Sequence, residues 1–217
     1  MRDEVVIDSP VNNKTVGEKW KPRVEGHWYE GAAAFAITHL GSGGGKSCLV
    51  IGSPLFELMM LEALYWEVTY LDCREPPLKP ERFVLGDATK PLFRGGSFDA
   101  VSSTCVLCHA GTGRYGDALD LEHGDEAMLS EIGRILKPEG KAVLMFGPVV
   151  DMAKPMRRGT EHRFYTVHEA HRMIKLSGLK LDTMKIWNTL AGGWRPATEM
   201  PTSSIENCDY LCVAVTH

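Results

Sequence analysis

The chain has 217 residues, of which 44% are hydrophobic, so it is long and apolar enough to form one substantial domain with a packed core. Its formal net charge of −4 provides no overall positive field that would attract nucleic acid or an anionic membrane. The first residues lack the basic and then apolar pattern of a secretory signal, and no apolar run approaches the roughly twenty residues of a membrane span. We therefore expect a cytoplasmic protein.

The N-terminal part of the chain contains one predicted helix. Residues 1–25 show little periodicity and are expected to form a lead-in to a single domain over residues 26–217. Residues 26–39 predict a helix that ends before the glycine-rich segment 41–45. This segment is not a phosphate loop, because the motif needs a glycine where Leu40 stands and because a phosphate cradle follows a strand. We interpret it as a flexible linker.

Residues 48–72 predict a βαβ unit. A short apolar run ends at Gly52, a helical segment continues to about residue 64, and a second short strand over residues 68–71 closes on Asp72. In an open α/β sheet a ligand lies over the carboxyl ends of the strands, where an acid about twenty residues after the first turn can bind a ribose diol. The unit therefore indicates a nucleoside-containing cofactor.

The remaining elements continue the alternation of strands and helices. Strands are predicted over residues 83–85, 98–102, 142–146, 179–187 and 210–215, and helices over residues 125–136 and 166–176, the second of them capped by Thr166. The total is seven strands. The polar, glycine-rich stretch 103–124 is too long for a simple connection, and long loops at the top of a sheet are usually functional. We expect the acceptor of a transferred group to bind there.

These elements carry motifs that resemble those of class I S-adenosylmethionine-dependent methyltransferases, from about residue 46 to residue 215. Residues 49–52 resemble the cofactor turn and Asp72 the ribose-binding acid. Residues 86–99, with Gly86-Asp87-Ala88, Pro91-Leu92 and Ser97-Phe98-Asp99, resemble the adenine-side motif, and residues 131–140 the helix and turn before the fifth strand. The resemblance implies a Rossmann-like α/β fold: a seven-stranded, mostly parallel sheet with helices on both faces and an antiparallel last strand.

A narrower resemblance is to a poorly characterised set of methyltransferase-like proteins. It is carried by the sequence Gly-Arg-Tyr-Gly-Asp at residues 113–117 and by His162-Arg163-x-Tyr165. This second resemblance indicates the fold and not the substrate.

The resemblance implies an S-adenosylmethionine-dependent methyltransferase that acts on a small-molecule acceptor by in-line methyl transfer. The sequence departs from the usual pattern after Gly52, where Ser53-Pro54 replaces further glycines and Pro54 removes an amide donor. The alternative is therefore a non-catalytic Rossmann-like binding or regulatory module that has lost the cofactor. A nicotinamide oxidoreductase is disfavoured, because no Gly-x-Gly-x-x-Gly follows the first strand.

The resemblance also assigns residues to the cofactor. Gly52 and Ser53 would face its methionine end, Asp72 and Cys73 its ribose, Asp87 and Ala88 its adenine, and Ser103 its amino group.

Candidate catalytic residues lie in the loop after the fourth strand and in the later loop. We expect a general base among His109, His162 and Tyr115, because histidine titrates near neutral pH while a tyrosine needs tuning. A loop histidine is also commonly just exposed to solvent.

Four residues of the same loops are candidates for acceptor binding. Arg114 and Arg163 can hold a carboxylate or phosphate through two parallel hydrogen bonds, or can instead fasten loops to Asp117 or Asp120. Asp117 and Tyr165 complete the set.

Six cysteines, at positions 48, 73, 105, 108, 208 and 212, are scattered along the chain, which favours reduced thiols. The sequence Cys105-Val-Leu-Cys108-His109 matches the spacing of covalent haem attachment and of a redox or metal half-site. Haem attachment occurs in exported proteins, and zinc would need a second ligand pair, so we expect a structural or acceptor-lining role and no metal. The expected partner is the small-molecule acceptor, without nucleic acid or membrane, and a homodimer is compatible with the sequence.

Overall fold

The computed structural model describes residues 28–149, 162–188, 193–197 and 209–217. The expected N-terminal lead-in lies outside these ranges. The described elements are α1 (Trp28–Leu40), β1 (Ser47–Ile51), α2 (Leu55–Ala63), β2 (Glu67–Asp72), β3 (Phe83–Leu85), β4 (Phe98–Thr104), the 3₁₀ helix η1 (Leu107–His109), α3 (Gly124–Ile135), β5 (Leu136–Val149), α4 (Val167–Leu176), β6 (Lys180–Asn188), β7 (Gly193–Pro196) and β8 (Asp209–Thr216).

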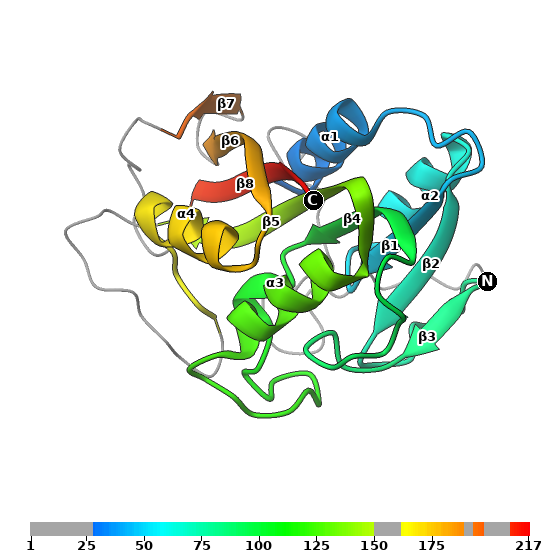
Figure 1. Cartoon of the computed structure of the whole chain (residues 1–217), viewed down its shortest axis with the longest axis horizontal. Coiled ribbons are helices and arrows are strands. Elements are labelled where there is room, and N and C mark those ends of the chain that lie inside the picture. The colour runs from blue at the N-terminus through cyan, green and yellow to red at the C-terminus, as the bar shows by residue number, and fades with distance from the viewer. Residues whose placement is uncertain (1–27, 150–161, 189–192, 198–208) are drawn as a thin grey trace, which may run out of the picture.

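The strands form one mixed sheet in the order β3-β2-β1-β4-β5-β8-β6-β7 (Figure 1). β1, β2, β3, β4 and β5 pair in parallel, whereas β8 runs antiparallel to both β5 and β6. The predicted α/β class, the mostly parallel sheet and the antiparallel last strand are confirmed. α1 packs beside α2, and α3 packs beside α4, so helices cover both faces of the sheet (Figure 1).

The sheet has eight strands in the described residues, so the predicted count of seven is wrong. The additional strand, β7, pairs antiparallel with β6 at the edge of the sheet. Its glycine and proline residues are unusual in a strand, but an edge strand tolerates proline because its N–H groups need no partner on one side. The ring of Trp194 packs 5.1 Å from those of both Trp187 and Phe35, which fastens β7 to β6 and α1.

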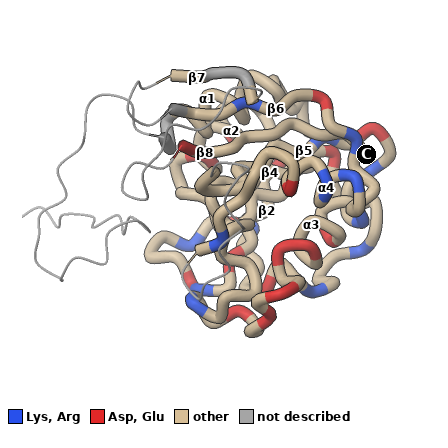
Figure 2. The backbone as a smooth tube through the Cα atoms, turned by 90° about the vertical axis from the view of Figure 1, so that its left-hand side faces the viewer, with Lys and Arg blue, Asp and Glu red and all other residues tan. Residues whose placement is uncertain are grey.

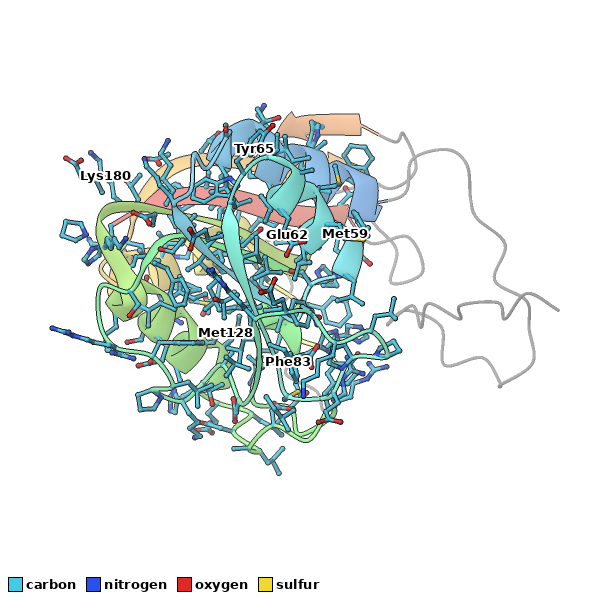
Figure 3. All side chains as sticks on the ribbon, turned by 90° about the vertical axis from the view of Figure 1, so that its right-hand side faces the viewer. Met59, Glu62, Tyr65, Phe83, Met128 and Lys180 are labelled. Carbon is cyan, nitrogen blue, oxygen red and sulfur yellow. The ribbon has the colours of Figure 1, made fainter. Side chains whose placement is uncertain are left out.

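The central strands are apolar because both of their faces are covered. Residues 48–51 of β1 are all buried, as expected for a strand in the middle of a parallel sheet. On α2, Leu58 and Leu61 are buried, whereas Met59 and Glu62 lie on the surface that faces the viewer in Figure 3. None of the helices in the described ranges has the length and apolar character that crossing a membrane requires.

The glycine-rich segment after α1 is an ordered turn, so its interpretation as a flexible linker is wrong. Gly43 lies against Trp66, and a Cβ at this glycine would be 2.6 Å from the indole ring. The Trp66 Nε1 donates to the carbonyl of Gly41 at 2.9 Å, and the amide of Gly43 donates to Leu64 at 2.9 Å. Gly43 therefore permits the turn to pack closely on Trp66, directly before β2.

Candidate functional site

The carboxyl ends of the parallel strands meet at one edge of the sheet, where β1 ends in a tight turn. Gly52 has a φ of +55°, and a Cβ at this position would lie 2.8 Å from the side chain of Val106. Its amide donates to the carbonyl of Leu71 in β2 at 2.7 Å. Only glycine suits this turn, which is the position predicted to face the methionine end of a cofactor.

Ser53 and Ser103, the two serines predicted to contact a cofactor, brace the turn through their hydroxyls. Both side chains are buried. The Ser53 Oγ accepts from the amide of Thr104 at 2.7 Å and donates to the carbonyl of Ile51 at 3.2 Å, and the Ser103 Oγ donates to the same carbonyl at 3.4 Å. These hydroxyls therefore tie the end of β1 to the end of β4.

Glu57, in the first turn of α2, is a buried carboxyl that the sequence did not reveal. It is 1% exposed and accepts a hydrogen bond from the Ser102 hydroxyl. Burial raises the pKa of Glu57, against the opposite effect of hydrogen bonds from Ser102, Thr104 and Ser53. The floor of the site thus contains an acid that resists ionisation.

The substitution Glu57→Gln is expected to stabilise the protein progressively as pH rises. A carboxyl with a raised pKa in the folded protein contributes its full stabilisation only below its pKa in the unfolded chain. Between the unfolded and the folded pKa, the free energy of unfolding falls by about 1.4 kcal/mol per pH unit. Glutamine does not ionise, so the unfolding free energy of the variant minus that of the wild type should increase above about pH 4.3 and then level off. Urea denaturation at a series of pH values measures it, with exposed Glu62→Gln as the control. A pH-independent difference would contradict the assignment.

Asp72 lies at the end of β2, as predicted for a ribose-binding acid. Its Oδ1 accepts from the amide of Arg74 at 2.9 Å and lies 3.6 Å from the Nε of that residue, and its Oδ2 accepts from the Tyr70 hydroxyl at 3.3 Å. The carboxylate is 10% exposed. Tyr70 and Arg74, which sequence reasoning missed, therefore orient this acid at the edge of the sheet.

Asp87 follows β3 and is also held by the chain. Its Oδ1 accepts from the amide and hydroxyl of Thr89 at 2.8 and 2.7 Å, and its Oδ2 accepts from the amide of Ala118 at 3.0 Å. Although burial acts in the opposite direction, backbone hydrogen bonds from Thr89 and Ala118 lower the pKa of Asp87. Neighbouring Ala88 is partly buried and packs on the core. Asp87 is thus an ionised acid on the same edge as Asp72.

The loop that connects η1 to α3 carries the Gly-Arg-Tyr-Gly-Asp sequence (Figure 1). We call residues 110–120 the β4–α3 loop. Its base is closed by a 2.8 Å hydrogen bond from the amide of Asp120 to the carbonyl of Gly111. Within the loop, the Asp117 carboxylate accepts from the amides of Gly113 at 3.4 Å and Tyr115 at 3.3 Å. Asp117, a predicted acceptor-binding residue, therefore shapes the turn.

The middle of the β4–α3 loop contacts the ends of β2 and β3. The Cys73 thiol donates to the carbonyl of Tyr115 at 3.4 Å, and the guanidinium of Arg74 lies 4.2 Å from the centre of the Tyr115 ring. The bond from Ala118 to Asp87 adds a third contact. The loop thus lies across the edge of the sheet that carries Asp72 and Asp87.

Arg163 and Tyr165 hold the base of this loop from inside the protein. Acidic residues, red in Figure 2, lie around α3. Asp125 of this helix is buried beside Arg163, with 3.5 Å between the arginine Nε and the aspartate Oδ2. Arg163 also donates to the carbonyls of Ala110 and Asp120, and the Tyr165 hydroxyl lies 3.0 Å from Asp125 Oδ2. Neither predicted acceptor-binding side chain is exposed. They act on the site by fixing the loop.

The three predicted catalytic residues come together although they lie on separate segments. The ring centre of His109 in η1 is 4.5 Å from that of His162 and 5.2 Å from that of Tyr115. His109 is buried, whereas His162 and Tyr115 are partly exposed. Burial raises the pKa of Tyr115, against the opposite effect of Arg114 and Arg74, so this phenol stays protonated at neutral pH.

Among the predicted acceptor-binding residues, Arg114 is the arginine whose guanidinium has the fewest polar partners in the described part of the chain. Its guanidinium lies 5.3 Å from the Tyr115 ring centre, and within the described ranges no carboxylate forms an ion pair with it. Its Nη1 is buried and has no hydrogen-bond partner among the described residues. Since a buried guanidinium nitrogen favours a charged partner, Arg114 is suited to an anionic group.

Comparison with known proteins supports the resemblance seen in the sequence. Residues 39–144 match a family model described as a methyltransferase domain. No curated protein matches the sequence.

Three solved structures illustrate the likeness in fold. The 1,6-didemethyltoxoflavin-N1-methyltransferase of Burkholderia thailandensis, with bound 1,6-didemethyltoxoflavin and S-adenosylhomocysteine, superposes with a TM-score of 0.64 at 17% identity over 88% of this chain and 78% of that one. The geranyl diphosphate C-methyltransferase of Streptomyces coelicolor, in complex with Mg²⁺, geranyl diphosphate and S-adenosylhomocysteine, gives 0.60 at 16% identity over 86% and 77%. The [4+2]-cyclase SpnF gives 0.59 at 15% identity over 87% and 80%. The likeness establishes the fold, and a fold can carry different reactions.

Proposed function

Because residues 39–144 match a methyltransferase domain on the class I methyltransferase fold, we propose that this protein is an S-adenosylmethionine-dependent methyltransferase acting on a small-molecule acceptor. The observation that carries the proposal is the edge of the sheet that joins the Gly52 turn, Asp72 and Asp87 to the cluster of His109, His162 and Tyr115. This edge combines two acids suited to a nucleoside with titratable groups suited to proton transfer.

The residues present fit the proposed cofactor. The Gly52 turn lets a ligand approach the backbone closely, and Asp72 can accept hydrogen bonds from a ribose diol. Asp87 and Ala88 would receive the adenine side, and Cys73 would lie with Asp72 on the ribose side. Two of the structural neighbours hold S-adenosylhomocysteine, which supports this assignment.

The cofactor would supply an electrophilic methyl group on a sulfonium centre. The protein has to align the acceptor with this group, and good alignment contributes on the order of 7 kcal/mol or more. Arg114 would orient an acceptor through an anionic group. His109 or His162 would remove the acceptor's proton, a step that typically adds about 10² to 10⁴ in rate.

The substitution Asp72→Ala is expected to weaken S-adenosylhomocysteine binding at least about tenfold, because hydrogen bonds to a charged group contribute about 1.5–3 kcal/mol each. Calorimetric titration of both proteins measures the change, and circular dichroism confirms that the variant is folded. Asp182→Ala, an exposed acid on β6, serves as the matched control. If Asp72→Ala binds as tightly as this control, Asp72 does not bind the ribose.

The reaction itself is tested by a transfer assay. The protein is incubated with S-adenosylmethionine carrying a labelled methyl group and with fractions of a protein-free metabolite extract. The proposal expects label in a small molecule with the wild-type protein and much less with Asp72→Ala. Label that stays on the cofactor in every fraction would contradict a small-molecule methyltransferase.

A second candidate, a non-catalytic binding or regulatory module, is favoured by a specific feature. The acids of the edge already accept hydrogen bonds from the chain, Asp72 from Arg74 and Asp87 from Ala118. The Ser53-Pro54 sequence also supplies fewer backbone donors than glycines would. In this case the β4–α3 loop would cover the edge permanently and no cofactor would bind.

A further inference from the structure

Two thiols meet at the end of β4, in a motif that the proposed methyl transfer does not use. Cys105 directly follows β4, and Cys108 lies in η1. The Cys108 thiol donates to the carbonyl of Cys105 at 3.6 Å, and each of the two thiols shifts the pKa of the other. The Cys108 thiol therefore lies against Cys105.

The backbone is adapted to this contact. Cys105 has a φ of +60°, a left-handed conformation that is strained for a residue other than glycine. On the other side, Gly147 of β5 makes room, because a Cβ there would lie 2.6 Å from the Cys108 Cβ and 2.9 Å from its Sγ. The backbone strain at Cys105 and the missing side chain at Gly147 together position the two cysteines.

The environment distinguishes the two thiols. The hydrogen bond from Cys105 and the nearby His109 lower the pKa of Cys108, although burial acts in the opposite direction. The pKa of Cys105 is raised by the same hydrogen bond and by burial. A thiol with a lowered pKa beside a second thiol is an arrangement in which thiol oxidation proceeds to a disulfide. Burial raises the pKa of Cys48 and of Cys212, so neither of these thiols is acidified as Cys108 is.

We propose that Cys105 and Cys108 form a redox-active dithiol that closes to an intramolecular disulfide with hydrogen peroxide as the oxidant. The Cys108 thiolate attacks a peroxide oxygen, the O–O bond breaks, and a sulfenic acid forms with the release of hydroxide. The Cys105 sulfur attacks this sulfenic sulfur, gives up its proton and expels a second hydroxide. The balance is two thiols and one peroxide giving one disulfide and two waters. Cys108 itself is 0% exposed, so in this step peroxide reaches its sulfur from the side of Cys105, which retains 8% exposure.

The proposal goes beyond methyl transfer and is tested without it. The reduced full-length chain is treated with hydrogen peroxide, and the remaining thiols are then alkylated under denaturing conditions. The mass of the tryptic peptide of residues 95–114 is measured by mass spectrometry. The expected peptide has lost two hydrogen atoms, carries no alkyl group and regains both thiols with dithiothreitol. Cys73→Ser, which removes a partly exposed thiol outside the pair, should behave identically.

Two outcomes would overturn the proposal. One is a peptide that keeps two alkylated cysteines at peroxide levels that oxidise Cys73. The other is a peptide with sulfinic acid and no loss of two hydrogens. Cys105→Ser should yield the sulfenic or sulfinic form of Cys108 instead, and if this variant does not fold, the peptide from the wild-type chain decides the question alone.

Discussion

Replacement of Arg163 by methionine is expected to lower the free energy of unfolding by about 3–5 kcal/mol, because removing one partner of a buried ion pair leaves the other charge uncompensated. Arg163 is 0% exposed, and its partner Asp125 is 1% exposed. The variant also loses the hydrogen bonds to the carbonyls of Ala110 and Asp120 that close the β4–α3 loop. Urea denaturation followed by circular dichroism measures the loss.

Two further variants separate this effect from the loss of any arginine. Arg82→Met removes an exposed ion pair with Glu67 and should cost no more than about 1 kcal/mol. The double variant Arg163→Met with Asp125→Asn removes both charges, so it should be more stable than Arg163→Met alone. Equal costs for Arg163→Met and Arg82→Met would show that Arg163 does not neutralise a buried acid.

His109→Asn and His162→Asn are expected to lower turnover by about 10² to 10⁴ if the changed residue is the general base, while leaving S-adenosylhomocysteine affinity nearly unchanged. The reason is that the His109–His162–Tyr115 cluster lies beside the nucleoside edge and not within it. Turnover is measured with the acceptor from the labelled-methyl assay, and affinity by calorimetry.

The control for these variants is His168→Asn, which changes an exposed histidine of α4. It should leave both turnover and affinity as in the wild type. Turnover that is unaltered in His109→Asn and in His162→Asn would exclude both histidines as the base, or would show that the acceptor needs none.

Much of the fold could be predicted because its determinants are local. The apolar run before Gly52 predicts β1, and Thr166 with Glu169 at the capping spacing predicts the start of α4, where the Thr166 hydroxyl accepts from the amide of Glu169 at 3.0 Å. β7 could not be predicted, because its only reason to be a strand is its pairing with β6 and the packing of Trp194 on Trp187 and Phe35. The sequence of a short, glycine-containing segment does not reveal that it pairs with another strand.

The candidate site was predictable in position and not in detail. A strand-end acid such as Asp72 follows from topology alone. The burial of Glu57 and Arg163 could not be predicted from the sequence, because charged residues are almost never fully buried unless they are paired. Asp125, the partner of Arg163, lies on a different element, so only the folded chain shows that this arginine supports the loop.

The central claim is that the edge formed by Gly52, Asp72 and Asp87 binds a sulfonium nucleoside cofactor. Isothermal titration calorimetry of the purified chain with S-adenosylhomocysteine and S-adenosylmethionine tests it most directly. The proposed methyltransferase predicts one site with a micromolar dissociation constant for the product. No detectable binding at millimolar ligand would contradict the claim and would identify the chain as a Rossmann-like module whose β4–α3 loop has replaced the cofactor.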